Sequence, residues 1–137
     1  NFMQDVAKAI LLERGNLVLQ LRDNIPSIAY PDMWSLFGGL IEENEDPQEA
    51  MLREIEEELC IKVKDICFLW DCIYCRKDGE KVLHKIYEAD ITPLWGKHRL
   101  MEGQAADSFH YDQLKTLRIP PFIQKVLARR QQEKVSE

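Results

Sequence analysis

The chain has 137 residues, with 24 acidic and 18 basic side chains and a formal net charge of −6 at pH 7. This length predicts a single domain, because domains commonly hold about 100 to 150 residues. Proteins that bind a nucleic acid polymer usually present a basic surface, so the acidic balance argues against that partner. No uncharged run reaches the roughly 20 apolar residues that span a bilayer, so we also expect no membrane partner.

The start of the chain and its cysteines favour a cytoplasmic protein. The chain does not open with a basic segment followed by an apolar one, so we expect no secretory signal. Four cysteines are present: Cys60, Cys67, Cys72 and Cys75. Cys72 and Cys75 have the C-x-x-C spacing of zinc and redox motifs, but no second pair completes a ligand set. We therefore interpret the cysteines as small core residues in a reducing compartment.

The first third of the chain is predicted to form strands. Residues 5–13 and 17–22 are apolar runs separated by a short turn, which is typical of a β-hairpin. Residues 23–33 contain two prolines and predict a loop. Residues 34–39 are expected to be extended and to run into a Gly-Gly pair.

A helix is predicted next. Residues 46–49, Asp-Pro-Gln-Glu, have the N-cap, first-turn proline and third-position glutamate of a helix start. The helix should continue to about Leu59. Leu52, Ile55 and Leu59 fall on one face, so we expect this face to be buried.

The remaining elements are a second hairpin and two more helices. Residues 61–75 and 81–90 predict strands, and the Asp-Gly between them is a strong hairpin signal. Residues 111–117 suit a short helix. A last helix is expected to start at Pro120-Pro121 and to end at about Arg130, followed by a polar tail that frays.

Three glutamates in the predicted helix stand out by their spacing. Glu54, Glu57 and Glu58 lie at i, i+3 and i+4, which places three carboxylates on one helix face. Like charges so placed repel by roughly 0.2–0.5 kcal/mol per pair on a solvated helix. A hard divalent cation such as Mg²⁺, which takes oxygen ligands, would remove that cost. The alternative is a solvated acidic face with no ligand.

The acidity of the chain is concentrated around this helix. Residues 42–58 contain nine acids and one base, Arg53, and so carry a net charge of −8, while the other residues sum to +2. The nine acids are Glu42, Glu43, Glu45, Asp46, Glu49, Glu54, Glu56, Glu57 and Glu58. The negative charge therefore belongs to one helix and its entry loop.

The run from Gly39 to Ile61 resembles the Nudix box, G-x5-E-x7-R-E-U-x-E-E-x-G-U, in which U is a bulky aliphatic residue. The fixed positions are filled here by Gly39, Glu45, Arg53, Glu54, Ile55, Glu57, Glu58 and Ile61. Cys60 stands where the family has glycine, and Phe37 stands where many members have proline. A glycine there ends the helix at positive φ, so Cys60 puts the geometry of that loop in question.

The resemblance implies a fold and a domain organisation. It extends over about residues 4–130 and implies an α/β Nudix fold, in which a mixed β-sheet is sandwiched between helices. We therefore expect a single Nudix domain over residues 1–137, with its core at about 4–130 and a polar C-terminal tail.

The resemblance also implies roles for individual residues. Glu54, Glu57, Glu58 and the backbone carbonyl of Gly38 match the family's metal ligands, for Mg²⁺ or for Mn²⁺ in its place. Arg53 matches a residue that holds a box carboxylate, and Glu57 at i+4 is within its reach. Glu45 matches a position near the same cluster.

Further roles fall on a loop and on the rim of the site. Glu102 resembles a loop glutamate that ligates metal or acts as base in some members; Glu54 and Glu58 are the other candidates for the base. Arg22 matches a contact to a substrate phosphate, and Phe37 and Gly39 match positions at the substrate. The aromatic residues that could stack on a base, or fill the core instead, are Trp34, Phe37, Trp70, Tyr74 and Trp95.

The activity implied is hydrolysis of the pyrophosphate bond in a nucleoside diphosphate linked to a group X, with Mg²⁺ as cofactor. Phe122-Ile123 after the two prolines, in place of an amide, argue against an 8-oxo-guanine nucleotide. The alternative is a non-catalytic Nudix module that senses a nucleotide or binds a protein. Many relatives are dimers, so a homodimer is a further expectation.

Overall fold

A computed structural model describes residues 4–136 of the chain, with side chains to residue 134. Its elements in chain order are β1 (Val6–Glu13), β2 (Asn16–Leu21), β3 (Trp34–Ser35), β4 (Phe37–Leu40), α1 (Pro47–Leu59), β5 (Cys67–Cys75), β6 (Lys81–Asp90), the 3₁₀ helix η1 (Thr92–Leu94), β7 (Ala105–Phe109), the 3₁₀ helix η2 (Tyr111–Thr116) and α2 (Pro121–Ser136). Within the described residues, neither α-helix is long and apolar enough to cross a membrane.

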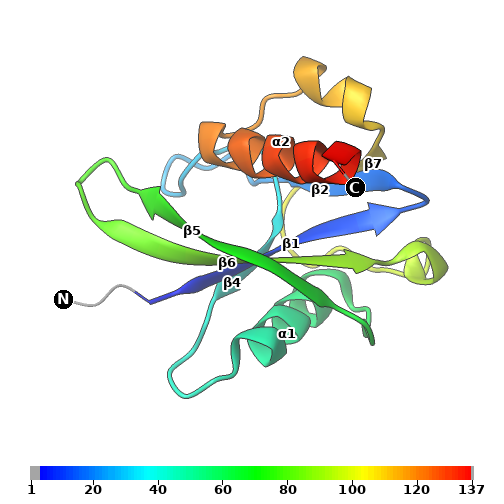
Figure 1. Ribbon diagram of the computed structural model, residues 1–137, viewed down its shortest axis with the longest axis horizontal. Coiled ribbons are helices and arrows are strands. Elements are labelled where there is room, and N and C mark those ends of the chain that lie inside the picture. The colour runs from blue at the N-terminus through cyan, green and yellow to red at the C-terminus, as the bar shows by residue number, and fades with distance from the viewer. Residues whose placement is uncertain (1–3, 137) are drawn as a thin grey trace.

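The strands form one mixed sheet with helices on both faces. The strand order is β3-β2-β1-β6-β5, with β4 paired to β1 and β7 paired to β2. The central pair, β1 and β6, is parallel, and the other pairs are antiparallel. Figure 1 shows α2 on one side of the sheet and α1 on the other. The predicted α/β fold with a sheet between helices is therefore confirmed.

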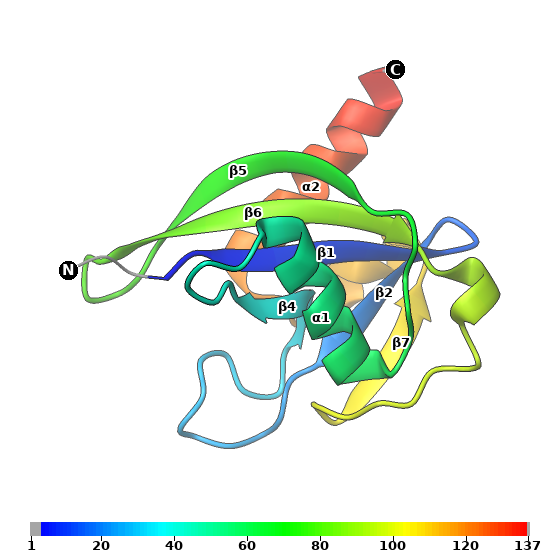
Figure 2. The ribbon, with the colours of Figure 1, turned by 90° about the horizontal axis from the view of Figure 1, so that it is seen from below.

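Two hydrophobic clusters hold the layers together. On one face Ala7, Ala9 and Leu11 of β1 pack against α1, which lies beside β1 and β4 (Figure 2). On the other face Ile10 and residues of β2, β5 and β6 pack against α2. Alternate residues of β1 thus serve opposite layers, as a strand buried on both faces requires. This alternation later decides which way Lys8 points.

The start of α1 follows the predicted chemistry. The Asp46 side chain accepts hydrogen bonds from the backbone N–H groups of Gln48 (3.1 Å) and Glu49 (3.2 Å), and Pro47 occupies the first turn. The buried face consists of Ala50, Met51, Ile55, Glu58 and Leu59. Leu52 is only half-buried, so its predicted place in the core was wrong. The helix is rotated so that Met51 faces the core and a glutamate, Glu58, is buried.

Cys60 ends α1 in the left-handed conformation that the glycine of the motif would adopt. Its φ is 55° and ψ is 34°, and its backbone N–H donates to the carbonyl of Glu56 at 2.8 Å. The loop geometry is therefore the one that a glycine would give, and the side chain costs about 1–2 kcal/mol of backbone strain.

Several other expectations need correction. β5 begins at Cys67 rather than residue 61, and α2 continues to Ser136 instead of fraying after Arg130. The polar end of α2 is supported by an ion pair between Arg129 and Glu133 at 3.1 Å and by pairing of Arg130 with Glu88 of β6. The predicted short helix at 111–117 is a 3₁₀ helix.

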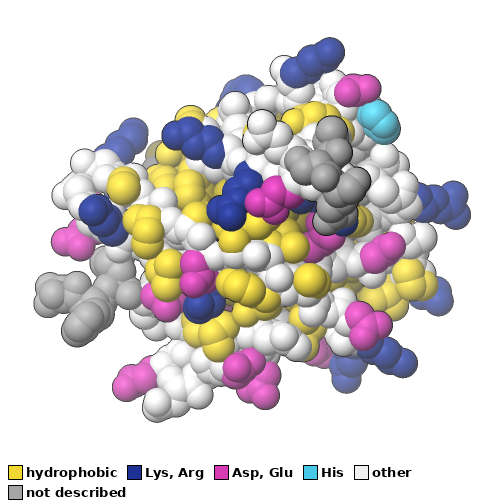
Figure 3. Space-filling model, in the orientation of Figure 1, with side chains coloured by type: hydrophobic (Ala, Val, Ile, Leu, Met, Phe, Trp, Pro, Cys, Tyr) yellow, Lys and Arg dark blue, Asp and Glu magenta, His cyan; other side chains and the backbone are white. Residues whose placement is uncertain are grey.

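The prediction that the cysteines are core residues was wrong. Cys60, Cys67 and Cys75 are exposed, and Cys72 is partly exposed. Three of the four lie on β5, an edge strand that also exposes Phe68 and Ile73. Figure 3 shows hydrophobic side chains along the face that β5 crosses. The prediction of burial failed for the cysteines of β5 because β5 is an edge strand, which has a neighbouring strand on one side only.

Replacing Cys60 with glycine should stabilise the protein. Glycine adopts a φ near 55° without a Cβ clash, so Cys60→Gly is expected to raise the free energy of unfolding by about 0.5–1 kcal/mol. Urea-induced unfolding measures this change. Cys60→Ala is the matched control, since it removes the thiol but keeps a Cβ. If alanine stabilises as much as glycine, backbone strain at this position is not the cause.

Candidate active site

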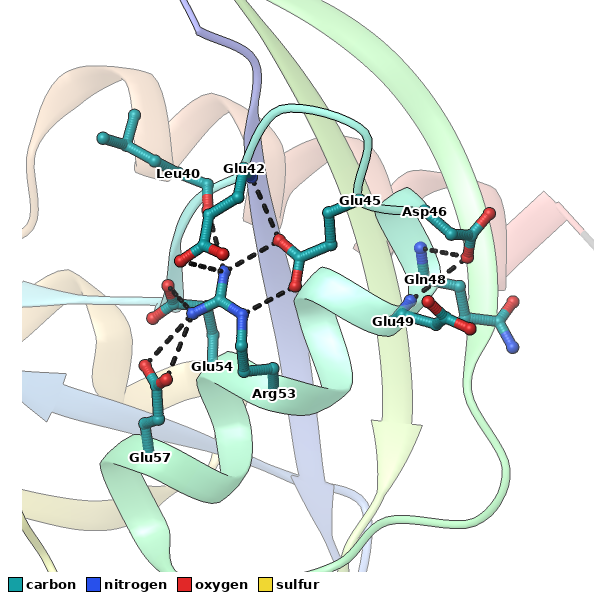
Figure 4. Close-up of polar contacts among 9 residues, drawn as sticks. All are labelled: Leu40, Glu42, Glu45, Asp46, Gln48, Glu49, Arg53, Glu54 and Glu57. Carbon is teal, nitrogen blue, oxygen red and sulfur yellow. Dashed lines mark hydrogen bonds and ion pairs between the residues drawn. The ribbon is translucent and has the colours of Figure 1, made fainter.

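Arg53 is the centre of a network that joins α1 to its entry loop. Its guanidinium bonds both oxygens of Glu45, through Nε at 2.7 Å and Nη2 at 3.0 Å. Its Nη1 donates to Glu54 at 3.0 Å and to Glu57 at 3.2 Å, and Nη2 donates to the carbonyl of Leu40 at 3.2 Å (Figure 4). The contact of Arg53 with Glu57 is the one that the i+4 spacing predicts, and Glu45 lies in the same cluster, as the resemblance implies. One cation therefore fixes three carboxylates relative to β4.

The hydrogen bonds within this network shift the ionisation of its members. The bond to Glu45 is the largest cause of a raised pKa of Arg53, and the bond to Arg53 is the largest cause of a lowered pKa of Glu45. Both groups therefore stay charged across the neutral range. Arg53 is a permanent clamp and not a group that exchanges protons.

Glu58 lies on the face of α1 that packs against the sheet, and it is almost fully buried. Its side chain is 2% exposed, and Oε1 accepts a hydrogen bond from the backbone N–H of Gly38 at 2.9 Å. Burial raises the pKa of Glu58 to about 8, against the opposing effect of Lys8. The negative charges of Glu102 and Glu54 raise it further. Glu58 is therefore a buried carboxylate beside two others, with Lys8 as the opposing positive charge, and a bound cation would favour its ionised form further.

Glu54 is bonded to Arg53 and is also close to Glu58. Burial raises its pKa, while Arg53 lowers it and the neighbouring carboxylates Glu57 and Glu102 raise it. The carboxylate lies against the backbone of Gly39: a Cβ built on that glycine would be 2.6 Å from Glu54 Oε1. Gly39 is therefore needed at this position because any side chain would displace Glu54.

Gly38 brings β4 equally close to β1. Its φ is 146°, and an added Cβ would be 2.0 Å from the carbonyl oxygen of Ala7. The Gly-Gly pair thus leaves bare backbone between β1 and the carboxylates of α1. The N–H of Gly38 holds Glu58; the metal-binding role predicted for its carbonyl stays a prediction.

Glu102 reaches the cluster from a distant loop. The backbone N–H of Met101 donates to the carbonyl of Glu58 at 2.9 Å, and the carbonyl of Glu102 accepts from Gln20 Nε2 at 2.9 Å. These bonds hold the loop beside the end of α1. The Glu102 side chain is exposed, yet close enough to raise the pKa of both Glu54 and Glu58.

The donor set fits a hard divalent cation. Glu54, Glu57, Glu58, Glu102 and the Gly38 carbonyl offer only oxygen ligands, as Mg²⁺ prefers. Among residues 4–136, no three His, Cys, Asp or Glu side chains converge closely enough to hold a metal ion as they stand. The reason is visible in their bonds, since Arg53 holds Glu54 and Glu57 while Gly38 holds Glu58. Small rotations of these side chains would be needed for coordination.

A cavity of about 630 Å³ opens beside Gly39, on the α2 face of the sheet. Tyr74 and Phe122 form part of an aromatic wall, with ring centroids 5.1 Å apart. Lys8 and Arg22 line the cavity together with Gly39. Because Gly39 also touches Glu54, the cavity and the carboxylate cluster share this residue.

Of the residues predicted to contact the substrate, not all line this cavity. Arg22 lines the cavity, where its Nε donates to the carbonyl of Ala29 at 2.9 Å. Phe37 does not: it is 0% exposed, and it packs in the hydrophobic cluster beneath α1. Its predicted place at the substrate was therefore wrong. The physical reason is strand alternation, because Phe37 pairs with Ala9 and both face α1.

Sequence reasoning gave no role in the site to Lys8, Tyr30 and His84, which line the cavity together with Phe122. Lys8 had a signal, since it is the one charged residue between Val6 and Leu12 in a strand of otherwise apolar residues. Tyr30 and His84 had none, because only the fold brings the loop before β3 and strand β6 together. Of the candidate aromatics, Tyr74 lines the cavity and Trp70 lies in the core.

Comparisons with known proteins agree with this arrangement. The NUDIX domain family matches residues 3–129. The chain therefore belongs to the Nudix family, and this membership supports a Nudix hydrolase in general.

Solved structures show the same fold at low sequence identity. A MutT NUDIX hydrolase from Burkholderia pseudomallei is 24% identical over 88% of both chains, with a TM-score of 0.70. A MutT protein from Methanosarcina mazei Go1 is 17% identical over 98% of this chain and 96% of its own, with a TM-score of 0.79. The NUDIX domain of Shewanella oneidensis NrtR, complexed with ADP ribose, is 15% identical over 97% and 89%, also with 0.79.

The buried His84 should make stability depend on pH. Burial lowers its pKa from 6.5 to about 4, although a bond to the Val82 carbonyl opposes this. Between these pH values the unfolded chain binds a proton that the folded protein does not, so the free energy of unfolding falls as the pH is lowered. By pH 4 this contribution amounts to roughly 3 kcal/mol.

The measurement compares urea unfolding of the wild type and His84→Phe at several pH values. The difference between the two proteins isolates His84, because the carboxylates with raised pKa values titrate in both. We expect the variant to lose the destabilisation between about pH 6.5 and 4. Parallel pH profiles would contradict the assignment.

Proposed function

We propose that this protein is a Mg²⁺-dependent hydrolase that cleaves the pyrophosphate bond of a nucleoside diphosphate linked to a group X. The observation that carries the proposal is the burial of Glu58, which is only 2% exposed although Glu54 and Glu102 are close enough for both to raise its pKa. Three carboxylates so placed are costly unless a cation joins them.

The residues present divide the work between them. Bound Mg²⁺ would neutralise the diphosphate and make a bound water more acidic. Arg53 holds Glu57 and Glu54 in place through ion pairs, and it favours the ionised form of Glu54 against the effect of burial. A carboxylate takes the proton from the attacking water; Glu54, Glu58 and Glu102 all remain candidates for this base.

The cavity supplies a place for the nucleoside part of the substrate. Its volume of about 630 Å³ lies within the usual range for small-molecule sites. Its aromatic wall offers stacking surface, and Gly39 gives the substrate a path toward the carboxylates. The diphosphate would then lie at the Gly38-Gly39 backbone. A cytoplasmic location and a homodimer stay predictions.

The test is release of nucleoside monophosphate from a panel of nucleoside diphosphate derivatives, with Mg²⁺ and with EDTA. We expect release only with the metal. Glu57→Gln removes a ligand charge at a side chain that is 53% exposed, so the fold should persist while the rate falls by roughly 100-fold or more.

Glu56→Gln is the matched control, one position away on the same helix. Glu56 is exposed and pairs with Lys62 at 3.9 Å, away from the network of Arg53. It should retain wild-type rates. Full activity of Glu57→Gln, or equal activity in EDTA, would refute the proposed mechanism. Binding without any release by the wild type would favour the non-catalytic module instead.

A further inference from the structure

Two basic residues lie together at the end of the cavity nearest the carboxylates. Lys8 is in β1, Arg22 follows β2, and both line the cavity with Gly39. Burial lowers the pKa of Lys8, the charge of Glu58 opposes this, and the nearby charge of Arg22 lowers the pKa further. A pair of like charges that is partly removed from water is unfavourable unless an anion lies between them.

The negative charges of Glu58 and Glu54 act on Lys8, but neither carboxylate bonds its ammonium among the described contacts. Within residues 4–136, its ammonium makes no hydrogen bond or ion pair, although most charged groups of the neighbouring site do. No side-chain nitrogen of the described residues is both fully buried and unbonded, so the ammonium keeps contact with solvent, and Lys8 lines the cavity. Burial is the largest influence on Lys8 and lowers its pKa.

The cavity offers this ammonium no negative side chain. The charged residues of its lining are Lys8, Arg22 and Arg76, and neither aspartate nor glutamate is among them. Arg76 is paired with Asp78 at 2.9 Å, outside the cavity lining. The excess positive charge is therefore concentrated at Lys8 and Arg22, in a protein whose net charge is −6.

The geometry of β1 places Lys8 opposite the metal-binding carboxylates. Ala7 and Ala9 face α1, so Lys8 between them points to the other face of the sheet. Lys8 is paired in register with Gly38, whose N–H binds Glu58. Since Gly38 has no side chain, only backbone separates the ammonium from the carboxylate cluster, and Glu58 and Glu54 act on Lys8 through it.

We propose that Lys8 is a phosphate-binding residue that, with Arg22, holds a phosphoryl group of the substrate on the cavity side of the Gly38-Gly39 backbone. The choice of a nucleotide phosphate as the anion rests on the proposed function. The carboxylates of α1 approach the diphosphate through the cation, while Lys8 and Arg22 contact it directly. Binding of a phosphorylated nucleoside therefore does not require the metal.

The test is calorimetric titration in EDTA with the four common ribonucleoside monophosphates and the corresponding nucleosides. For at least one base, the wild type should bind the monophosphate about ten- to hundred-fold more tightly than the nucleoside. Lys8→Met keeps the length of the side chain but removes the charge, and should reduce that preference to about three-fold or less. Lys8→Arg should restore most of it.

Arg76→Met is the matched control, because it removes a positive charge from the same cavity at the hairpin end. It should leave the preference for the monophosphate unchanged. Thermal unfolding checks that each variant is folded, and Lys8→Gln replaces Lys8→Met if the latter is not. Titration with inorganic phosphate alone shows whether the anion must belong to a nucleoside.

Three results would overturn the assignment: an unchanged preference in the folded Lys8 variants, an equal loss in Arg76→Met, or no metal-free binding of any monophosphate by the wild type. The outcome is separable from that of the proposed hydrolysis. Glu57→Gln should bind monophosphates in EDTA like the wild type, even if it has lost activity. The proposed hydrolysis could therefore be refuted while phosphate binding by Lys8 is confirmed, or the reverse.

Discussion

The close approach of bare backbone to buried carboxylate at Gly38-Gly39 is the constraint on which the site depends. Gly38 donates its N–H to Glu58, and Gly39 leaves the space that Glu54 occupies. A side chain at either position would meet a backbone or carboxylate oxygen at 2.0 or 2.6 Å. The same two residues pair with Lys8 and Ala7 in the register of β4 with β1, so sheet pairing and site geometry share one short segment.

The charges are arranged in two groups on either side of this segment. On the α1 side, Arg53 binds Glu45, Glu54 and Glu57 but not Glu58, whose pKa stays raised by burial despite the charge of Lys8. On the α2 side, Lys8 and Arg22 face a cavity without acidic residues. A diphosphate with a bound cation is complementary to both groups, because it carries negative oxygens and positive metal at once. Each group alone is electrostatically unfavourable, and the ligand would relieve both.

Much of this could be predicted from the chain, and the limits have physical causes. The helix start at Asp46 and the pairing of Arg53 with Glu57 depend on residues within a few positions of one another, so local rules sufficed. Phe37 and the cysteines were misjudged, because burial depends on which strand pairs where. Lys8, Tyr30 and His84 meet only through the parallel pairing of β1 with β6 and the folding of a loop over it. Contacts between residues far apart in the chain produce little recognisable pattern in a single sequence.

The ionisation of Glu58 is the most direct test of the claim that this cluster is built to bind a divalent cation. Carbon-13 NMR of its carboxyl group, followed over a pH titration, measures this ionisation with and without saturating Mg²⁺. Without metal, we expect a pKa of about 8, caused chiefly by burial. With Mg²⁺ the carboxylate should stay ionised through the neutral range, because the cation favours the charged form. A raised pKa that does not respond to Mg²⁺ would contradict the account, since the buried carboxylate would then have some other purpose.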